Sequence, residues 1–369
     1  MTQAQLEIQL VAIVVAASCA LPGVFLVLRR MAMMSDAISH AILFGIVIAF
    51  FAVGDLASPL LILGAAATGL LTVVSVELLQ RSGRVREDAA IGIVFPVLFS
   101  IGVILIARNA GQVHLDTDAV LLGELAFAPF DRLMIGGVDF GPKSLTVMLA
   151  ILTLNVAFIA VFFKELKLAT FDAPLAAALG LAPVLLHYLS MAIVSITAVG
   201  AFHAVGSILV VALMIAPPAT AYLLTDRLSR MLLYSVAIGV VTAVAGYWLA
   251  HALDASIAGS MATVSGLLFG IVFLVAPRHG LLAGMRRRSR QHRQFAEAML
   301  AIHLFSHENS PDAATECHKD HLSGHLRWPR DRAERVVTQS VSDQLITNQQ
   351  GNLRLTALGR TMAQEWLVQ

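Results

Sequence analysis

Apolar stretches of about the length that crosses a lipid bilayer recur along the first three quarters of the chain, between short polar breaks. A helical span needs about 20 predominantly apolar residues, because the hydrocarbon core of a bilayer is about 30 Å thick. Candidate spans lie near residues 8–28, 37–53, 59–79, 91–107, 145–163, 184–200, 203–224, 232–251 and 257–276. The runs 184–200 and 203–224 almost touch, so we expect one of them to be broken or tilted. The pattern predicts an all-α polytopic membrane protein with about 8–9 transmembrane helices.

The pattern changes near Met285, where the apolar runs give way to mixed sequence. Residues 1–285 carry 13 Lys and Arg against 15 Asp and Glu, whereas residues 286–369 carry 12 basic and 9 acidic residues in under a quarter of the length. With 58% hydrophobic and 13% charged residues overall, the chain is typical of a protein whose solvent is mostly lipid. We therefore predict a transmembrane domain at 1–285, a basic juxtamembrane linker at 286–294 and an aqueous domain at 295–369.

The sequence pattern of residues 295–369 predicts a small α+β domain. Apolar positions indicate helices at Phe295–Leu304 and Ala333–Ile346, then two short extended runs about a QQGN turn, and a final helix near Ala357–Leu367. This order resembles the winged-helix domains of metal-dependent transcriptional repressors, most closely in the run LRLTALGRTMAQEW. Basic residues beside a membrane are typical of an anchor on the cytoplasmic side, so we do not expect nucleic acid to be a partner.

Two ionisable residues, Asp36 and His40, open an otherwise apolar helical run. Such groups cost several kcal/mol in lipid unless something offsets the cost, and intramembrane ionisable residues commonly mark function. Their spacing of four places both side chains on one helix face, so the pair could hold a cation. Alternatively, Ser35 or Asp36 could cap the helix N-terminus while a backbone carbonyl satisfies His40. The residues alone leave both interpretations open.

Basic residues cluster in four of the polar breaks and so orient the chain by the positive-inside rule. With strict alternation of nine spans, all four clusters fall on the cytoplasmic side, and so does the C-terminus; they are Arg81 to Arg86, Lys164 and Lys167, Arg227 and Arg230, and Arg286 to Arg293. The same alternation places Asp36 and His40 low in the membrane. Since a site that is entered from outside should sit higher, we expect the second segment to be bent or re-entrant.

The segment Phe163–Pro183 interrupts the spans with a loop that is too apolar and regular for a linker. Asp172 can cap a short helix that has Pro174 in its first turn, and Gly180 can end that helix. An exposed amphipathic helix of this kind needs a partner to cover it.

The chain contains no GxxxxGK[ST] motif, so it lacks a phosphate-binding loop for ATP. We expect a transport subunit rather than an enzyme, with no catalytic residues and with any ATP hydrolysis on a separate chain.

Five runs together resemble the permease subunit of manganese, zinc and iron uptake ABC transporters, over roughly residues 10–285 in order. They are LVLRRMAMMSDAISHAILFGIVIAF, REDAAIGIVFPVLFSIGV, FKELKLATFDAPLAAALGL, AFHAVGSILVVALMIAPPATAYLLTDRL and LLFGIVFLVAPRHGLL. The resemblance implies a type II ABC importer in a bacterial inner membrane. Its partners would be an ATPase dimer, an extracytoplasmic solute-binding protein and a second permease, identical or related.

The resemblance also implies roles for single residues. In that family the aspartate and histidine of the DAxSHA motif hold the cation, which favours ligation over capping for Asp36 and His40. His203, at the head of AFHAVGS, is a candidate third ligand, although a packed histidine is the plainer interpretation. The family's coupling helix matches 171–180; the residues that we carry over are Phe171, Asp172, Leu175, Ala178 and Gly180.

Carboxylate and imidazole ligands suit Mn, Zn or Fe(II), which would be cargo; no permanently bound cofactor is implied. Two other functions stay open: a membrane-anchored metal-responsive regulator and a secondary metal transporter. The region 295–369 also holds a set of metal-binding residue types within a short stretch: His303, His307, Cys317, His318, His321 and His325. A cytoplasmic metal sensor and plain surface histidines explain this set equally well.

Overall fold

The computed structural model describes residues 2–54, 60–109, 125–135, 138–277, 280–311 and 313–368. It divides into two compact units, Met1–Gly280 and Leu281–Gln369, and each unit has its own hydrophobic core. The division lies close to the change in sequence character at Met285. We call Leu281–Gln369 the tail.

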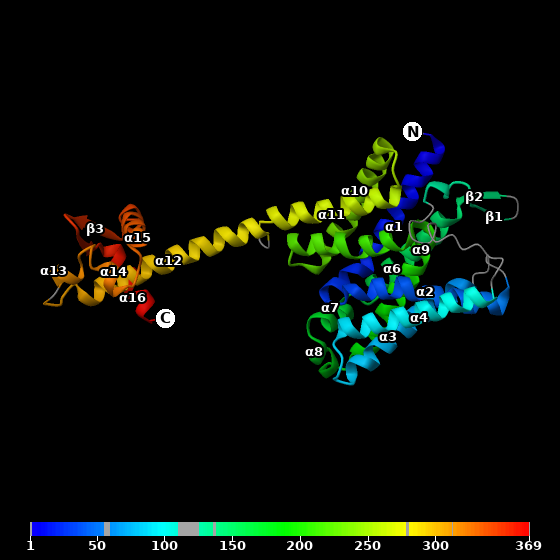
Figure 1. The fold of residues 1–369 in the computed structure, drawn as a ribbon, viewed down its shortest axis with the longest axis horizontal. Helices are drawn as coiled ribbons and strands as arrows, with labels where there is room; N and C mark the ends of the chain where they lie inside the picture. The colour runs from blue at the N-terminus through cyan, green and yellow to red at the C-terminus, as the bar shows by residue number, and fades with distance from the viewer. Residues whose placement is uncertain are drawn as a thin grey trace. The chain divides into compact units, whose positions relative to one another are not determined.

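The first unit is a bundle of long apolar helices (Figure 1). In chain order its elements are α1 Gln3–Leu28, α2 Ala32–Val53, α3 Leu60–Arg81, α4 Glu87–Asn109, a 3-10 turn at Leu125–Phe127, β1 Arg132–Ile135, β2 Val138–Pro142, α6 Lys143–Val161, α7 Phe163–Phe171, α8 Ala173–Ala178, α9 Pro183–Leu224, α10 Leu228–Leu253 and α11 Ile257–Val275. Within the described residues, eight of these helices are long and apolar enough to cross a membrane. This agrees with the predicted helical membrane domain.

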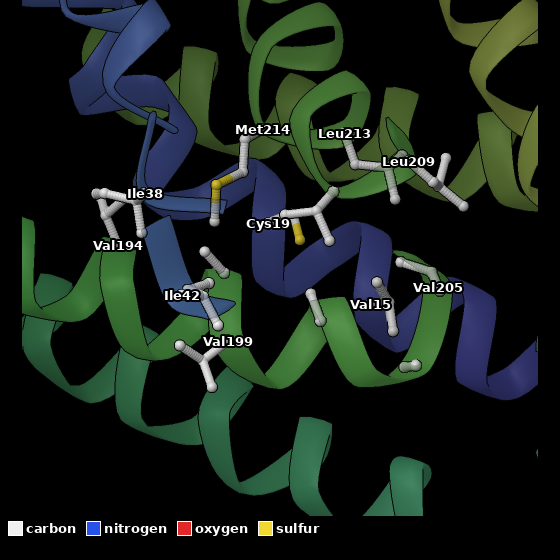
Figure 2. Close-up of a cluster of buried hydrophobic side chains, with 14 of the residues drawn as sticks. Val15, Cys19, Ile38, Ile42, Val194, Val199, Val205, Leu209, Leu213 and Met214 are labelled. Carbon is white, nitrogen blue, oxygen red and sulfur yellow. The ribbon is translucent and has the colours of Figure 1, made fainter. Parts of the chain in front are cut away.

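One of the eight, α9, contains a sharp turn. Its 42 residues would extend about 63 Å if straight, twice the thickness of a bilayer core. At Gly206 the backbone adopts φ 78° and ψ 168°, a conformation that residues with a Cβ rarely adopt. Figure 2 shows Val194, Val199 and Val205 along one arm, with Leu209, Leu213 and Met214 returning on the other. The predicted runs 184–200 and 203–224 are therefore two arms of one element, each long enough to span.

Helix α1 lies at the centre of the bundle. Its apolar window is 83% buried, whereas α2, α3 and α4 bury 39% or less of theirs. It packs against α6, both arms of α9, and α10; Figure 2 shows Val15 and Cys19 of α1 among side chains of α2 and α9. A buried hydrogen-bonded link adds to this packing, because Asn155 of α6 donates to Ser18 O (2.9 Å) and to Thr197 Oγ1 (3.0 Å).

One end of the bundle is held by a polar network around Glu77 of α3. Tyr188 Oη donates to Glu77 Oε2 (2.6 Å), and His187 Nε2 lies 2.6 Å from Glu77 Oε1. On its other side, His187 Nδ1 contacts Arg29 NH1 (3.2 Å), while Arg29 Nε donates to Thr170 Oγ1 (3.3 Å). The network joins the C-terminal ends of α1 and α3 to α7 and to the start of α9. The connections α1–α2, α3–α4 and α6–α9 therefore share one face, as the predicted alternation requires.

The opposite end carries a β-hairpin. Strands β1 and β2 pair antiparallel, with Met134 opposite Asp139 and an irregularity between Arg132 and Met134. Arg132 bonds to Asp139 Oδ2 (2.6 Å) and to Glu7 near the start of α1 (3.3 Å to Oε2), so the hairpin is tied to the N-terminal end of α1.

The tail contains four short or medium helices around a second hairpin, after one long helix (Figure 1). Its elements are α12 Leu281–His307, α13 Ala313–Glu316, α14 Leu322–His325, α15 Arg330–Ser342, β3 Ile346–Gln349, β4 Asn352–Leu355 and α16 Ala357–Val368. The hairpin has the predicted QQGN turn, with Gln349 opposite Asn352. The basic stretch 286–294, predicted as a linker, is helical and continuous with the rest of α12. The likeness to winged-helix repressors remains an expectation.

Candidate functional site

Asp36 and His40 lie together on α2, one helical turn apart. His40 Nε2 is 3.4 Å from Asp36 Oδ1, and the two side chains are 33% and 31% exposed. The apolar side of His40 faces α4, whose Phe95 and Phe99 rings have centroids 5.7 and 6.3 Å from the imidazole. The pair therefore presents one carboxylate and one imidazole from a single face of a span, each about one third exposed.

The capping interpretation of this pair is wrong. Helix α2 starts at Ala32 with Met31 in the N-cap position, its first turn contains no acidic residue, and its N-cap makes no side-chain bond. Ser35 Oγ donates to Ala32 O (2.9 Å) rather than accepting from a free amide. The helix begins early because the chain turns sharply at Arg30, whose φ is 62°. Asp36 is therefore inside the helix.

The structure also corrects the expected shape of the second segment. Helix α2 runs without a break from Ala32 to Val53, so it is neither bent nor re-entrant. Asp36 and His40 come four and eight residues after its start, which corresponds to about 6 and 12 Å along the helix axis. The pair lies in the half of the span nearer the Glu77 network.

His203 does not form a group of candidate metal ligands with Asp36 and His40. It is exposed on the first arm of α9, three residues before Gly206, and its ring is T-shaped to that of Phe202 at a centroid distance of 6.1 Å. A metal site would need a group of three or more His, Cys, Asp or Glu side chains. Among the described residues, such a group lies in the tail and does not include His203. Within the described part of this chain, Asp36 and His40 thus form a two-ligand set.

The predicted coupling segment forms as its sequence indicated. Asp172 is the N-cap of α8, and its Oδ1 accepts from Leu175 N at 3.0 Å, with proline in the first turn. Gly180 ends the segment with φ 79°, and its N–H donates to Ala177 O (3.0 Å). Ala178 is exposed on the last turn of α8. These local signals predicted the geometry because each acts on its own neighbours.

The surface of this segment is apolar. Phe171 is 61% exposed, Leu175 45% and Leu179 64%; the last was not among the predicted contact residues. Three large apolar side chains on one short segment form a surface of the kind that a partner covers.

The tail histidines divide into two sets. His303, His307, His321 and His325 come together with Glu316, which was not among the predicted metal-binding residues. Cys317 instead lies in the tail core, 7% exposed, and burial raises the pKa of its thiol. His318 turns away, with its Nδ1 3.4 Å from Asp320 Oδ2. The available signal for Glu316 was its position directly before the run CHKDH.

Comparisons with known proteins agree with this architecture. Residues 1–276 match the family described as the ABC 3 transport family. The chain is 45% identical over 359 residues to "Zinc transport system membrane protein TroD" of Treponema pallidum, covering 97% of this chain and 98% of that protein. It is 49% identical to "Manganese transport system membrane protein MntD" of Bacillus subtilis, covering 73% of this chain and 91% of that protein.

A solved structure shares the fold. The chain superposes on "PsaBC from Streptococcus pneumoniae in complex with Fab" with a TM-score of 0.64 and 28% identity, covering 76% of this chain and 94% of that chain. Because the family match spans about three quarters of the sequence and the relatives are matched over most of their own length, this protein belongs to the ABC 3 transport family of membrane permeases.

Proposed function

We propose that this protein is the permease subunit of an ATP-driven importer that carries divalent transition-metal ions across the bacterial inner membrane, and that Asp36 and His40 hold the ion in transit. The observation that carries the proposal is a carboxylate and an imidazole 3.4 Å apart inside a membrane span, with no capping role to explain them. Relatives named for zinc and manganese transport support it.

The donor set is consistent with the cargo. One carboxylate oxygen and one imidazole nitrogen suit Mn, Zn or Fe(II), whereas thiolates would favour softer ions. Relatives in the same family are named for zinc, for manganese and, in Yersinia pestis, for chelated iron, so the metal differs among similar chains. Incomplete coordination suits transport, because an ion held too tightly cannot leave.

A second permease subunit would complete the site. Transition metals take four or more ligands, and Asp36 and His40 supply two. Both side chains are about one third exposed on the bundle surface, where lipid would leave an ion pair poorly solvated. A permease dimer that brings two such faces together would cover the pair and add ligands, and His203 stays a candidate third ligand.

The exposed segment 171–180 would seat in a groove of the ATPase. Phe171, Leu175 and Leu179 supply the apolar contacts, and Asp172 and Gly180 fix the ends of the short helix that presents them. Behind the segment, Thr170 joins the Glu77 network through Arg29. A movement of the ATPase that displaces α7 and α8 would thereby be transmitted to α1, α3 and α9.

This arrangement supports one orientation of the protein in the membrane. The face with the Glu77 network, α7, α8 and the basic connections would be cytoplasmic, by the positive-inside rule. The face with the β1–β2 hairpin would receive metal from an extracytoplasmic solute-binding protein. The tail follows α11 and would be cytoplasmic, and ATP hydrolysis would take place on a separate ATPase dimer.

Uptake by the reconstituted complex tests the proposal. Wild-type permease, ATPase and binding protein would be assembled in vesicles, and ATP-dependent uptake of Mn²⁺, Zn²⁺ and Fe²⁺ measured. We expect Asp36→Ala and His40→Ala to reduce uptake by at least about tenfold, because even outer-shell changes at metal sites cost roughly 10–100-fold. Both variants should still co-purify with the ATPase.

His251→Ala is the matched control, since His251 is an exposed histidine on α10 and contacts Tyr247 rather than α2. Its uptake should equal that of the wild type. Full uptake by the Asp36 and His40 variants would refute the proposed site, and uptake without ATP or ATPase would indicate a secondary transporter instead.

A further inference from the structure

The tail gathers five metal-binding side chains from three elements. His303 and His307 occupy the last turns of α12, Glu316 ends α13, His321 is the N-cap of α14 and His325 is its last residue. The ligand atoms of Glu316, His321 and His325 lie within 4.8 Å of one another. This tail histidine cluster lies beyond residue 276, where the family match ends.

Glu316 brings a buried carboxylate oxygen into the cluster. Its Oε2 is buried, and the side-chain atom that it contacts is His325 Nε2, at 3.0 Å. Buried carboxylate oxygens are normally paired with a donor or coordinated by a metal, because an unpaired one loses its hydration without compensation. His321 and His325 are exposed, so they are not placed there by core packing.

Two further histidines are oriented as metal ligands commonly are. His307 Nδ1 lies 2.8 Å from His303 O, and His303 Nε2 lies 3.1 Å from Glu316 O. A carbonyl only accepts, so each of these nitrogens carries the proton and donates it. His307 Nε2 and His303 Nδ1 are then left with lone pairs, and ligating histidines typically donate their second N–H to a backbone carbonyl in this way.

The ring spacings fit a shared ion. Two imidazoles bound to one tetrahedral zinc at about 2.0–2.1 Å have ring centroids roughly 5 Å apart. The centroids of His321 and His325 are 6.0 Å apart, those of His303 and His325 are 5.8 Å apart, and those of His307 and His325 are 6.4 Å apart. Ligand atoms around such an ion lie about 3.3 Å apart, so Glu316, His321 and His325, whose ligand atoms lie within 4.8 Å of one another, need shifts of roughly 1–2 Å to close on it. His307 is outside that group and has to move closer as well.

We propose that the tail histidine cluster is a binding site for a zinc-like divalent ion, held by Glu316, His321 and His325 with His307 Nε2 as fourth ligand. A set of three imidazoles and one carboxylate matches tetrahedral zinc, and nitrogen-rich sites bind Zn²⁺ more tightly than Mn²⁺. The ion would join α12, α13 and α14. The site is separate from the transport pair and would exist whichever metal is carried.

Metal content of the full-length protein tests the site. The background is Asp36→Ala/His40→Ala, which removes the transport pair and leaves the tail unchanged. After chelator treatment and equilibration with Zn²⁺ alone, followed by desalting, we expect about one zinc per chain by elemental analysis. Adding His321→Ala and His325→Ala should reduce this to nearly none. Because both side chains are exposed, the tail should keep its fold, which circular dichroism would verify.

The control is His292→Ala in the same background, since His292 is an exposed histidine on α12 outside the cluster. It should retain the zinc. A second readout uses Co²⁺, whose strong visible absorption in tetrahedral sites should appear in the background protein and weaken in Glu316→Gln. Zinc content and cobalt absorption that are unchanged by the cluster substitutions, or absent from the background protein, would overturn the proposal.

Discussion

Asp36 and His40 differ from the buried hydroxyl groups of the spans, because each contacts another ionisable side chain rather than a carbonyl of its own helix. The buried hydroxyls of Ser18, Ser39 and Thr72 donate to carbonyls of their own helices and so need nothing further. One contact of 3.4 Å does not satisfy the hydrogen-bonding groups of both a carboxylate and an imidazole. Both side chains are also about one third exposed within a membrane span, where lipid offers no hydrogen bonds. The remaining hydrogen-bonding capacity of these two side chains is the reason we propose that they bind an ion.

Asn155 illustrates the opposite case, a polar residue in a span with a purely structural role. Asn155→Leu removes its bonds to Ser18 O and Thr197 Oγ1, while Thr197 keeps its own bond to Ile193 O (2.8 Å). Interhelical bonds of this kind contribute about 0.6 kcal/mol on average and up to about 1.7. We expect a loss of stability in this range by equilibrium unfolding in detergent micelles.

Thr153→Ala is the comparison variant, because Thr153 is exposed on α6 and bonds only within its helix, to Leu149 O. It should change stability by less than about 0.5 kcal/mol. An Asn155→Leu protein as stable as the wild type would mean that the α1–α6–α9 link contributes nothing.

At the scale of elements, α8 and the turn in α9 have different structural roles. Helix α8 is only six residues long, so its position depends on the Asp172 cap and on Gly180 rather than on its own hydrogen bonds. The turn at Gly206 allows the two arms of α9 to pack on α1 and so builds the centre of the bundle.

Leu175→Asp tests the coupling surface. Burying a leucine contributes about 1.5–3 kcal/mol, which corresponds to roughly ten- to hundredfold in affinity. We expect the variant to bind the ATPase at least about tenfold more weakly, as measured by titration of the purified permease with ATPase. Phe130→Asp, at the hairpin end and with Phe130 79% exposed in the wild type, should bind the ATPase normally. Equal weakening in both variants, or in neither, would contradict the assignment.

Gly206→Val tests the turn. A β-branched residue at φ 78° costs of order 1–3 kcal/mol, so thermal unfolding should begin at a lower temperature than in the wild type. Gly270→Ala is the control, since a Cβ there would have no neighbour within 4 Å in the described structure. If Gly206→Val unfolded at the wild-type temperature, the turn would not depend on glycine.

Sequence predicted the features that depend on near neighbours. The apolar runs gave the spans, and Asp172, Pro174 and Gly180 gave α8, because caps and turns act within a few residues. It failed where distant residues decide. The β1–β2 hairpin is tied by Arg132 to Glu7, and Glu316 meets its histidines only through the tail fold. The start of α2 was missed for a local reason, because its tight turn falls on Arg30 rather than on Gly or Asn.

At the scale of the whole molecule, one chain supplies two side chains to the proposed transport site, one exposed segment that we propose for coupling and a tail with its own core. Each of the first two is incomplete alone, which is the property expected of a subunit. The tail is shared with the Treponema relative, whose match covers 97% of this chain, whereas the Bacillus relative matches only 73% of it. The tail is therefore an addition to the transport unit that only some relatives carry.

The most direct measurement is the position of the metal in the assembled transporter. A map of the complex with bound Zn²⁺, collected at and away from the zinc absorption edge, would locate each ion by its anomalous difference. We expect an ion about 2.0–2.2 Å from an Asp36 carboxylate oxygen and a His40 ring nitrogen. An ion elsewhere along the bundle, with Asp36 and His40 bonded only to protein groups, would contradict the proposed role of the pair.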